Sequence, residues 1–136
     1  MSAQDGTEPI EGSEILYRRV PASMGWFSEG HLSPQAFDPR DADTTGLSVS
    51  RGKYKSAEEA ARGMSKKGYY VAAFLAEVLI QRGIRIVPRP LADDPSHAEL
   101  PDLNYGNRLT DETRELMLAL SECWTSVDGP FHVQAS

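Results

Sequence analysis

Hydrophobic and polar residues alternate in several short stretches of the chain, and this alternation predicts strands. The segment EILYRRVP at 14–21 alternates in this way until a proline ends it. GLSVS at 46–50 has the same period of two, which places Leu47 and Val49 on one face of a strand and the two serines on the other. Two further strands are predicted, IRIV at 84–87 and a short one at 97–100.

Capping residues mark the beginnings of two helices. Ser56 with Glu59 three positions later makes a capping box, so we expect a short helix from this point to Arg62. Thr110 precedes two acidic residues and an apolar stripe at helical spacing. This pattern predicts a longer helix over 111–124.

The segment YYVAAFLAEVLIQRG at 69–83 has two interpretations, one buried helix or a strand followed by a short helix. Its aromatic and β-branched residues come first, and its helix-forming residues follow. Gly83 is suited to end a helix. We therefore predict a strand over 69–74 and a helix over 76–82.

Between the first two predicted strands, residues 21–45 are mostly polar and contain no apolar run long enough for a core helix. Within them, SPQAF at 33–37 predicts one short helical turn, because Ser33 can cap it and Pro34 suits its first position. This turn would direct Phe37 toward the core.

A chain of 136 residues, 40% hydrophobic and 25% charged, has the size and composition of one globular domain. We predict a single α/β (α+β) domain over 14–128, with a small mixed sheet of about four to six short strands and about three helices. Residues 1–13 are acidic and poor in apolar side chains, which predicts a disordered tail, and residues 129–136 are interpreted either as a C-terminal tail or as a final edge strand.

Several classes of protein are excluded by what the sequence lacks. The single cysteine, Cys123, excludes an intramolecular disulfide framework. No stretch approaches the roughly 18 apolar residues of a membrane span. The first residues have neither the basic n-region nor the apolar h-region of a signal peptide. We therefore expect a cytoplasmic protein without a membrane contact, and the sequence makes no prediction of its oligomeric state.

Charge is distributed unevenly along the chain. The net charge of −6 argues against nucleic-acid binding, because affinity for phosphate backbones needs a surplus of lysine and arginine. Residues 51–67 nevertheless hold six basic and two acidic side chains, which indicates either a solvated helix with basic flanks or a patch for an acidic partner or a phosphate. For a protein partner, the predicted contacts are Trp26, Phe27, Arg51, Lys53 and Lys55.

Arg18 and Arg19 are the first candidates for chemistry, because a strand must turn one of two adjacent side chains inward. An arginine buried alone is costly, so the inward one needs a partner. The partner is either a carboxylate of the loop 38–43 or a bound phosphate or carboxylate that the guanidinium grips.

His31 and His97 lie in polar segments without the spacing of a metal motif, so no metal and no cofactor is predicted. Each histidine is interpreted either as a surface or capping residue, or as a general acid or base that titrates near neutral pH. The serines lie outside any nucleophile elbow, and the chain has neither a P-loop nor a dinucleotide fingerprint. No complete catalytic motif is present.

The order of several motifs resembles an uncharacterised group of short bacterial proteins. The shared elements are LYRRVP at 16–21, Trp26, SPQAF at 33–37, GLSVS at 46–50, GYYVAAF at 68–74, GIRIVPRP at 83–90 and SHAEL at 96–100. The resemblance covers about residues 14–100 and implies a bacterial cytoplasmic protein, with no activity attached. If the shared motifs mark a ligand site, its members are Arg18, Arg19, Ser33, Phe37, Ser48 and His97.

Two classes of function follow from these observations. The first is a non-catalytic binding or interaction module, accessory, regulatory or antitoxin-like, which acts through another protein; the small size and the missing catalytic motif favour it. The second is a small enzyme for a nucleotide-like or phosphorylated substrate, with an arginine as anion anchor and a histidine that moves a proton. It rests on an analogy of residue types with small enzymes that hold nucleotides or NAD. The enzyme class requires the arginines and a histidine to converge on one concave site.

Overall fold

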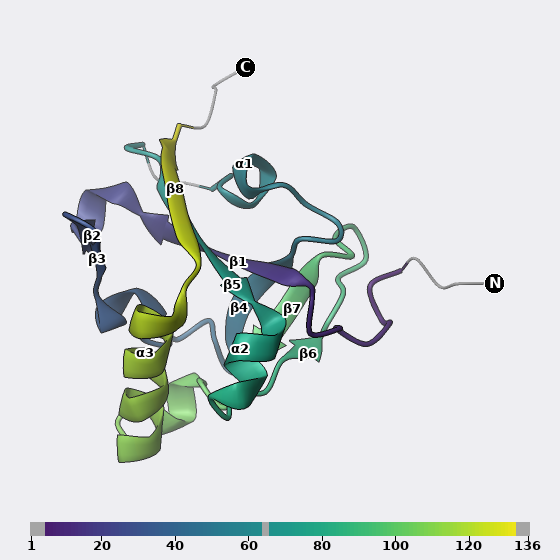
Figure 1. The fold of residues 1–136 in the computed structure, drawn as a ribbon. Helices are drawn as coiled ribbons and strands as arrows, with labels where there is room; N and C mark the ends of the chain where they lie inside the picture. Colours follow the sequence, from purple (N-terminus) through teal and green to yellow (C-terminus); the bar gives the residue numbers. More distant parts are fainter. Residues whose placement is uncertain (1–4, 64–65, 133–136) are drawn as a thin grey trace.

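A six-stranded antiparallel sheet organises the computed structural model, which describes residues 5–63 and 66–132 (Figure 1). Across the sheet the strand order is β6 (Val87–Pro88), β7 (His97–Leu100), β4 (Leu47–Arg51), β1 (Ile15–Pro21), β5 (Tyr69–Leu75) and β8 (Ser126–Phe131). A separate hairpin pairs β2 (Phe27–Ser28) with β3 (His31–Leu32). The fold is α+β, as the sequence predicts.

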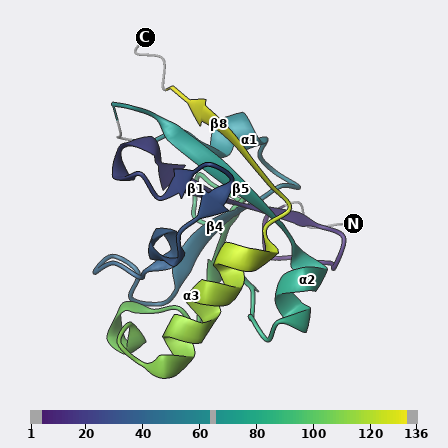
Figure 2. The same cartoon turned by 60° about the vertical axis from the view of Figure 1, so that its left-hand side comes forward.

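Helices cover the two faces of the sheet unequally. α2 (Ala76–Gln81) and α3 (Asp111–Cys123) lie on one face, and α1 (Ala57–Ala60) lies on the other (Figures 1 and 2). Three 3-10 turns join these elements, at Ala22–Met24, Pro34–Phe37 and Tyr105–Asn107. Because α1 has only four residues, it covers a small part of its face.

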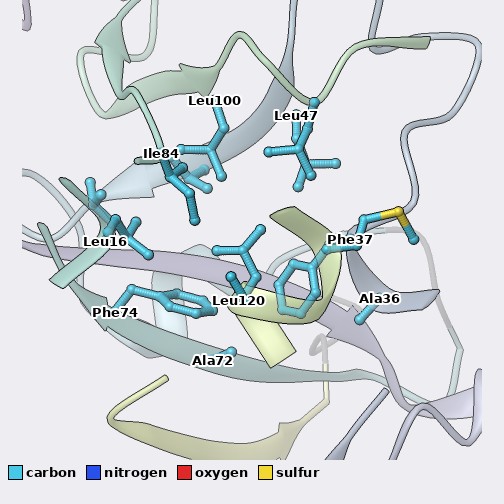
Figure 3. Close-up of a cluster of buried hydrophobic side chains, with 14 of the residues drawn as sticks. Leu16, Ala36, Phe37, Leu47, Ala72, Phe74, Ile84, Leu100 and Leu120 are labelled. Atoms are coloured by element: carbon cyan, nitrogen blue, oxygen red, sulfur yellow. The ribbon is translucent and has the colours of Figure 1, made fainter. Parts of the chain in front are cut away.

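The main hydrophobic core lies between the sheet and the helices α2 and α3 (Figure 3). Leu16 and Val20 of β1 and Phe74 of β5 turn toward it, and Leu120 of α3 packs from the other side. Phe37 meets Phe74 edge to face, with ring centroids 5.8 Å apart, which is a favourable aromatic geometry. The period of two along each strand therefore decides which side chains are buried here.

A smaller apolar cluster lies on the α1 side of the sheet. Its buried members are Ala60, Ala61, Tyr69 and Val71. α1 begins with the predicted capping box, in which the Ser56 hydroxyl accepts from the Glu59 N–H and the Glu59 carboxylate accepts from the Ser56 N–H. This cluster fixes α1 against β1 and β5.

Several local predictions are confirmed. The segment 69–83 forms β5 followed directly by α2, and Gly83 just after the helix has a φ of +78°, which glycine adopts without strain. Thr110 caps α3 and Ser33 caps its 3-10 turn, each through a hydroxyl that accepts a backbone N–H. The strands predicted at 14–21, 46–50 and 97–100 correspond to β1, β4 and β7.

The strand predicted over 84–87 is shorter in the structure, where only Val87–Pro88 pairs with β7. Ile84 instead inserts into the core, with 1% of its surface exposed. Its N–H donates to the Leu79 carbonyl, so the chain is still closing α2 at this position. Strand pairing begins only after the chain has left the helix.

Residues 5–13 pack against the domain, which differs from the disordered tail that their composition predicts. The carbonyl oxygens of Gly6, Glu8 and Pro9 accept hydrogen bonds from the Arg51 guanidinium. A buried cation therefore orders a segment that has few apolar side chains of its own. The first four residues of the predicted tail lie outside the described residues.

Of the two interpretations of residues 129–136, the final edge strand is confirmed for residues 129–131, which belong to β8. Phe131 pairs with Tyr69 of β5, which makes β8 an edge strand of the sheet. Residues 133–136 lie outside the described residues. Among the helices that the structure describes, none combines the length and the apolar character needed to cross a bilayer.

Candidate anion-binding cleft

A cleft of about 860 Å³ opens beside α1. Five basic and three acidic side chains line it, although the chain as a whole has a net charge of −6. Positive charge is therefore concentrated here against an acidic background. The lining residues are Tyr17, Arg18, Arg19, Pro21, Met24, Trp26, Arg40, Ala42, Asp43, Ser48, Val49, Ser50, Lys55, Glu59, Ala60, Arg62, Tyr69, Asp94 and His97.

The cleft includes the point where β1 and β4 separate. The register pairs of these strands end at Tyr17–Ser50, although both strands continue beyond that pair. From there on, β1 and β4 can present groups to the cleft rather than to each other. The separation accounts for a lining that includes both Val49, which faces the core, and Ser48, which faces the other side of the sheet.

Arg18 occupies this split. It is the half-buried residue between Leu16 and Val20 on β1 and shares their face of the sheet. Its Nη1 donates to the Ser48 carbonyl oxygen at 2.9 Å, and its Nη2 donates to the Ala36 carbonyl oxygen at 3.4 Å. Its Nε is buried and has no hydrogen-bond partner within the described residues. One donor of this guanidinium therefore lacks an acceptor in the part of the chain that the structure describes.

Burial lowers the pKa of Arg18 to about 10; the Asp43 carboxylate offsets this effect in part, and the cations of Arg19 and Arg40 add to it. An unperturbed arginine keeps its proton to a higher pH. At neutral pH Arg18 is charged in both the folded and the unfolded protein, so burying the charge lowers the free energy of unfolding. Above about pH 10 the folded protein releases this proton, and the free energy of unfolding rises.

Three further arginines line the cleft without a carboxylate partner. The Arg19 guanidinium lies over the Tyr69 ring, 4.9 Å from its centroid, and donates to the Arg62 carbonyl oxygen. The Arg40 guanidinium lies over the Trp26 ring at 5.3 Å. Over residues 5–63 and 66–132, none of the cleft arginines forms an ion pair with a carboxylate. The aromatic rings position these cations but do not neutralise them.

Ser48 and His97 form a hydrogen-bonded pair in the cleft. Ser48 Oγ lies 3.2 Å from His97 Nε2, and His97 Nδ1 lies 2.8 Å from the Arg89 carbonyl oxygen. Because a carbonyl oxygen can only accept, Nδ1 carries a proton, and Nε2 of the neutral ring is left to accept from the Ser48 hydroxyl. The backbone of residue 89 thus selects the tautomer that can take a proton from serine.

Four of the six predicted ligand residues line this cleft, namely Arg18, Arg19, Ser48 and His97. Phe37 does not, because its 3-10 turn places it in the core with 1% of its surface exposed. Ser33 does not either, and its hydroxyl accepts the Gln35 N–H as a cap. His31 is exposed on β3 and lies outside the lining. The histidine that meets the arginines is therefore His97.

Sequence reasoning missed several lining residues. Arg40 and Arg62 lie in separate segments of the chain and belong to no sequence motif. Only the folded structure brings them into one cleft with the residues of β1. The strand period could have identified Tyr17 and Ser50, because both share a face with Ser48. For Tyr69 the sequence indicates a strand residue and does not indicate a place in the cleft.

The predicted aromatic partner contacts are not a flat exposed patch. Trp26 is half-buried and lines the cleft under Arg40. Phe27 is also half-buried and packs edge to face on Tyr70 and on Trp124, with centroids 5.0 Å and 6.2 Å away. Both rings therefore already have neighbours within the chain.

The predicted basic partner contacts lie in different environments. Arg51 is completely buried and binds the Glu14 carboxylate through two hydrogen bonds, so it is a structural residue and not a surface contact. Lys53 and Lys55 stay at the surface but pair with carboxylates, at 3.2 Å from Glu8 and 3.0 Å from Asp94. Arg51, Lys53 and Lys55 therefore do not form one continuous free basic patch.

No group of three or more histidine, cysteine, aspartate or glutamate side chains within the described part of the chain is arranged to hold a metal ion. Comparison with protein-family models, with curated proteins and with solved structures finds no match to this chain. The resemblance to short bacterial proteins therefore stays a prediction, and function must be argued from the cleft.

Proposed function

We propose that the cleft binds a small phosphorylated, nucleotide-like molecule. The observation that carries this proposal is the convergence of Arg18, Arg19, Arg40 and Arg62, which form no ion pair with a carboxylate in the described ranges. Like charges gathered in a partly desolvated cleft repel each other, and a bound anion removes that repulsion.

Arginine also matches the shape of the proposed ligand. Its planar fork donates two parallel hydrogen bonds to a phosphate or carboxylate group. The unused Nε of Arg18 lies in the same planar group as the two nitrogens that hold the backbone. A phosphate oxygen at this position would provide the acceptor that Nε lacks.

A nucleotide suits the cleft better than inorganic phosphate does. A volume of about 860 Å³ is in the range of pockets that hold small organic molecules. Trp26 lines the cleft and is only half-buried, so its ring can provide an aromatic surface on which a base stacks. The hydroxyls of Tyr17 and Ser50 are available as hydrogen-bonding groups for a sugar.

The alternative is the non-catalytic module that acts through a protein partner. It calls for an exposed surface with aromatic anchors, whereas Trp26 and Phe27 are both half-buried. We therefore rank it second. An accessory or antitoxin-like role becomes the better proposal if no small molecule binds.

A thermal-shift panel tests the proposal with pyrophosphate, AMP, ADP and NAD, and with adenosine as the uncharged control. A ligand at roughly 100 times its Kd adds about 2.7 kcal/mol to the free energy of unfolding. We expect a clear rise in Tm with phosphorylated compounds and none with adenosine. A flat panel would reject a nucleotide site in favour of the protein-partner class.

Two charge-matched variants locate the binding in this panel. Arg40→Gln in the cleft should weaken binding about 10-fold, the usual effect of losing one hydrogen bond to a charged group. Arg85→Gln removes the same charge from an exposed site outside the lining and should leave affinity unchanged. Equal losses in both variants would mean that overall charge, rather than the cleft, attracts the ligand.

Trp26→Leu separates a nucleotide site from a phosphate site. Stacking on an aromatic side chain contributes about 1–3 kcal/mol per base, so we expect AMP affinity to fall at least about 5-fold. Pyrophosphate has no base, so its affinity should fall by less than that of AMP, and the smaller loss should come from Arg40, which the Trp26 ring positions. Titration calorimetry with the two ligands measures both. A parallel loss would show that Trp26 only maintains the shape of the cleft.

A further inference from the structure

We propose that Ser48 is a nucleophile and His97 its general base, so that the cleft cleaves a phosphoester or phosphoanhydride bond in its ligand. This inference rests on the proposed function, because the arginines must first hold the phosphate. It assigns a reaction to the cleft in addition to ligand binding.

The geometry meets the requirements of such a pair. A serine is activated when a base lies within hydrogen-bond reach and a third group orients that base. Ser48 Oγ is 3.2 Å from His97 Nε2, and the Arg89 carbonyl holds Nδ1 at 2.8 Å. The carbonyl takes the orienting place that a carboxylate has in a catalytic triad. Both side chains line the cleft.

The pair is not simply the contact that sheet pairing would impose. The register places His97 opposite Ser50, so its ring reaches diagonally to Ser48. Ser48 is also the residue whose carbonyl oxygen accepts from Arg18 Nη1. The cation that would hold phosphate oxygens is therefore anchored on the backbone of the proposed nucleophile. Such a cation stabilises the charge that develops on a transferring phosphoryl group.

The reaction balances with water as the only co-reactant. Ser48 Oγ attacks phosphorus, its proton moves to His97 Nε2, and the bond from phosphorus to the leaving oxygen breaks as that oxygen takes the proton. Water then attacks the phosphoserine, His97 takes one of its protons, and Ser48 Oγ leaves and is reprotonated. The products are an alcohol or a phosphate, and the released phosphate.

The test uses the full chain with two reagents, p-nitrophenyl phosphate as substrate and a fluorophosphonate as label. A nucleophilic serine attacks the phosphorus of the fluorophosphonate, displaces fluoride and becomes covalently labelled. We expect p-nitrophenolate release, and an adduct that tandem mass spectrometry locates on Ser48. Ser48→Ala should lose both. His97→Asn keeps a donor for the Arg89 carbonyl but lacks the base, and it should slow both at least about 100-fold. Ser28→Ala, exposed on β2, should change neither.

Two measurements separate this inference from the proposed function. The Tm of each variant must stay near the wild-type value, and Ser48→Ala must still show the thermal shift with pyrophosphate. If the wild type binds phosphorylated ligands but gives neither product nor adduct, or the adduct forms on another residue, the nucleophile is rejected and the binding site stands. If no ligand binds and Ser48 is not labelled, both are rejected.

Discussion

Replacing Arg51 with methionine should lower the free energy of unfolding by about 3–5 kcal/mol. Arg51 has no exposed surface, and its Nε and Nη2 each lie 2.8 Å from an oxygen of Glu14. Hydrogen bonding to that carboxylate raises the pKa of Arg51, so the ion pair is maintained at any pH at which the carboxylate is charged. Methionine would leave the largely buried Glu14 carboxylate and the carbonyls of Gly6, Glu8 and Pro9 without their donor.

An exposed pair of the same geometry provides the control. Arg85 binds Asp102 through two hydrogen bonds of 3.0 Å and 2.8 Å, but 67% of the arginine side chain and 37% of the aspartate side chain are exposed. Arg85→Met should therefore cost only about 0–1 kcal/mol. Urea denaturation of both variants measures the difference. Equal losses would show that burial is not what gives the Arg51 pair its effect.

Replacing Arg18 with methionine should weaken pyrophosphate binding about 100-fold and change the free energy of unfolding of the ligand-free protein by less than about 1 kcal/mol. The affinity falls because truncating a partly desolvated charge that faces an anion typically costs 2–5 kcal/mol or more. Stability changes little because two opposing effects nearly cancel. The variant loses hydrogen bonds to two carbonyls, but it also removes a cation whose pKa burial holds at about 10.

This pattern of lost binding and retained stability distinguishes a ligand anchor from a structural arginine. Calorimetric titration and urea denaturation on the same preparation measure the two quantities. A loss of several kcal/mol in unfolding free energy, as expected for Arg51→Met, would show that Arg18 mainly supports the fold. Arg18→Lys adds a second comparison: it keeps the charge but loses the planar fork, so most of the affinity should still be lost.

Much of the fold could be predicted because its signals are local. The junction between β5 and α2 is determined by residue types on either side of Leu75, and the caps at Ser33, Ser56 and Thr110 act within three residues of themselves. The prediction failed where distant contacts override local preference. Ile84 has strand propensity, but it is buried in the core instead of pairing in the sheet. Residues 5–13 have few apolar side chains, but hydrogen bonds from Arg51 hold their backbone.

The cleft could be predicted only in part for the same reason. Arg18, Arg19, Ser48 and His97 lie on strands, where the period of two indicates which way a side chain points. Arg40 and Arg62 lie on connecting segments, and no spacing relates them to β1. The pairing of Ser48 with His97, which are 49 residues apart in sequence, depends on β4 and β7 being neighbours in the sheet. Strand order, rather than any motif, creates the pair.

The two outer strands of the sheet have a consequence for how the chain meets other proteins. An open sheet edge can template a strand from another molecule, which leads to β-augmentation or aggregation. β6 is two residues long and ends in Pro88, and β8 carries Pro130 near its end. Proline has no N–H to give to an added strand. Each outer strand therefore carries a residue that cannot donate to an added strand, whereas the cleft presents four arginines that form no ion pair with a carboxylate in the described residues.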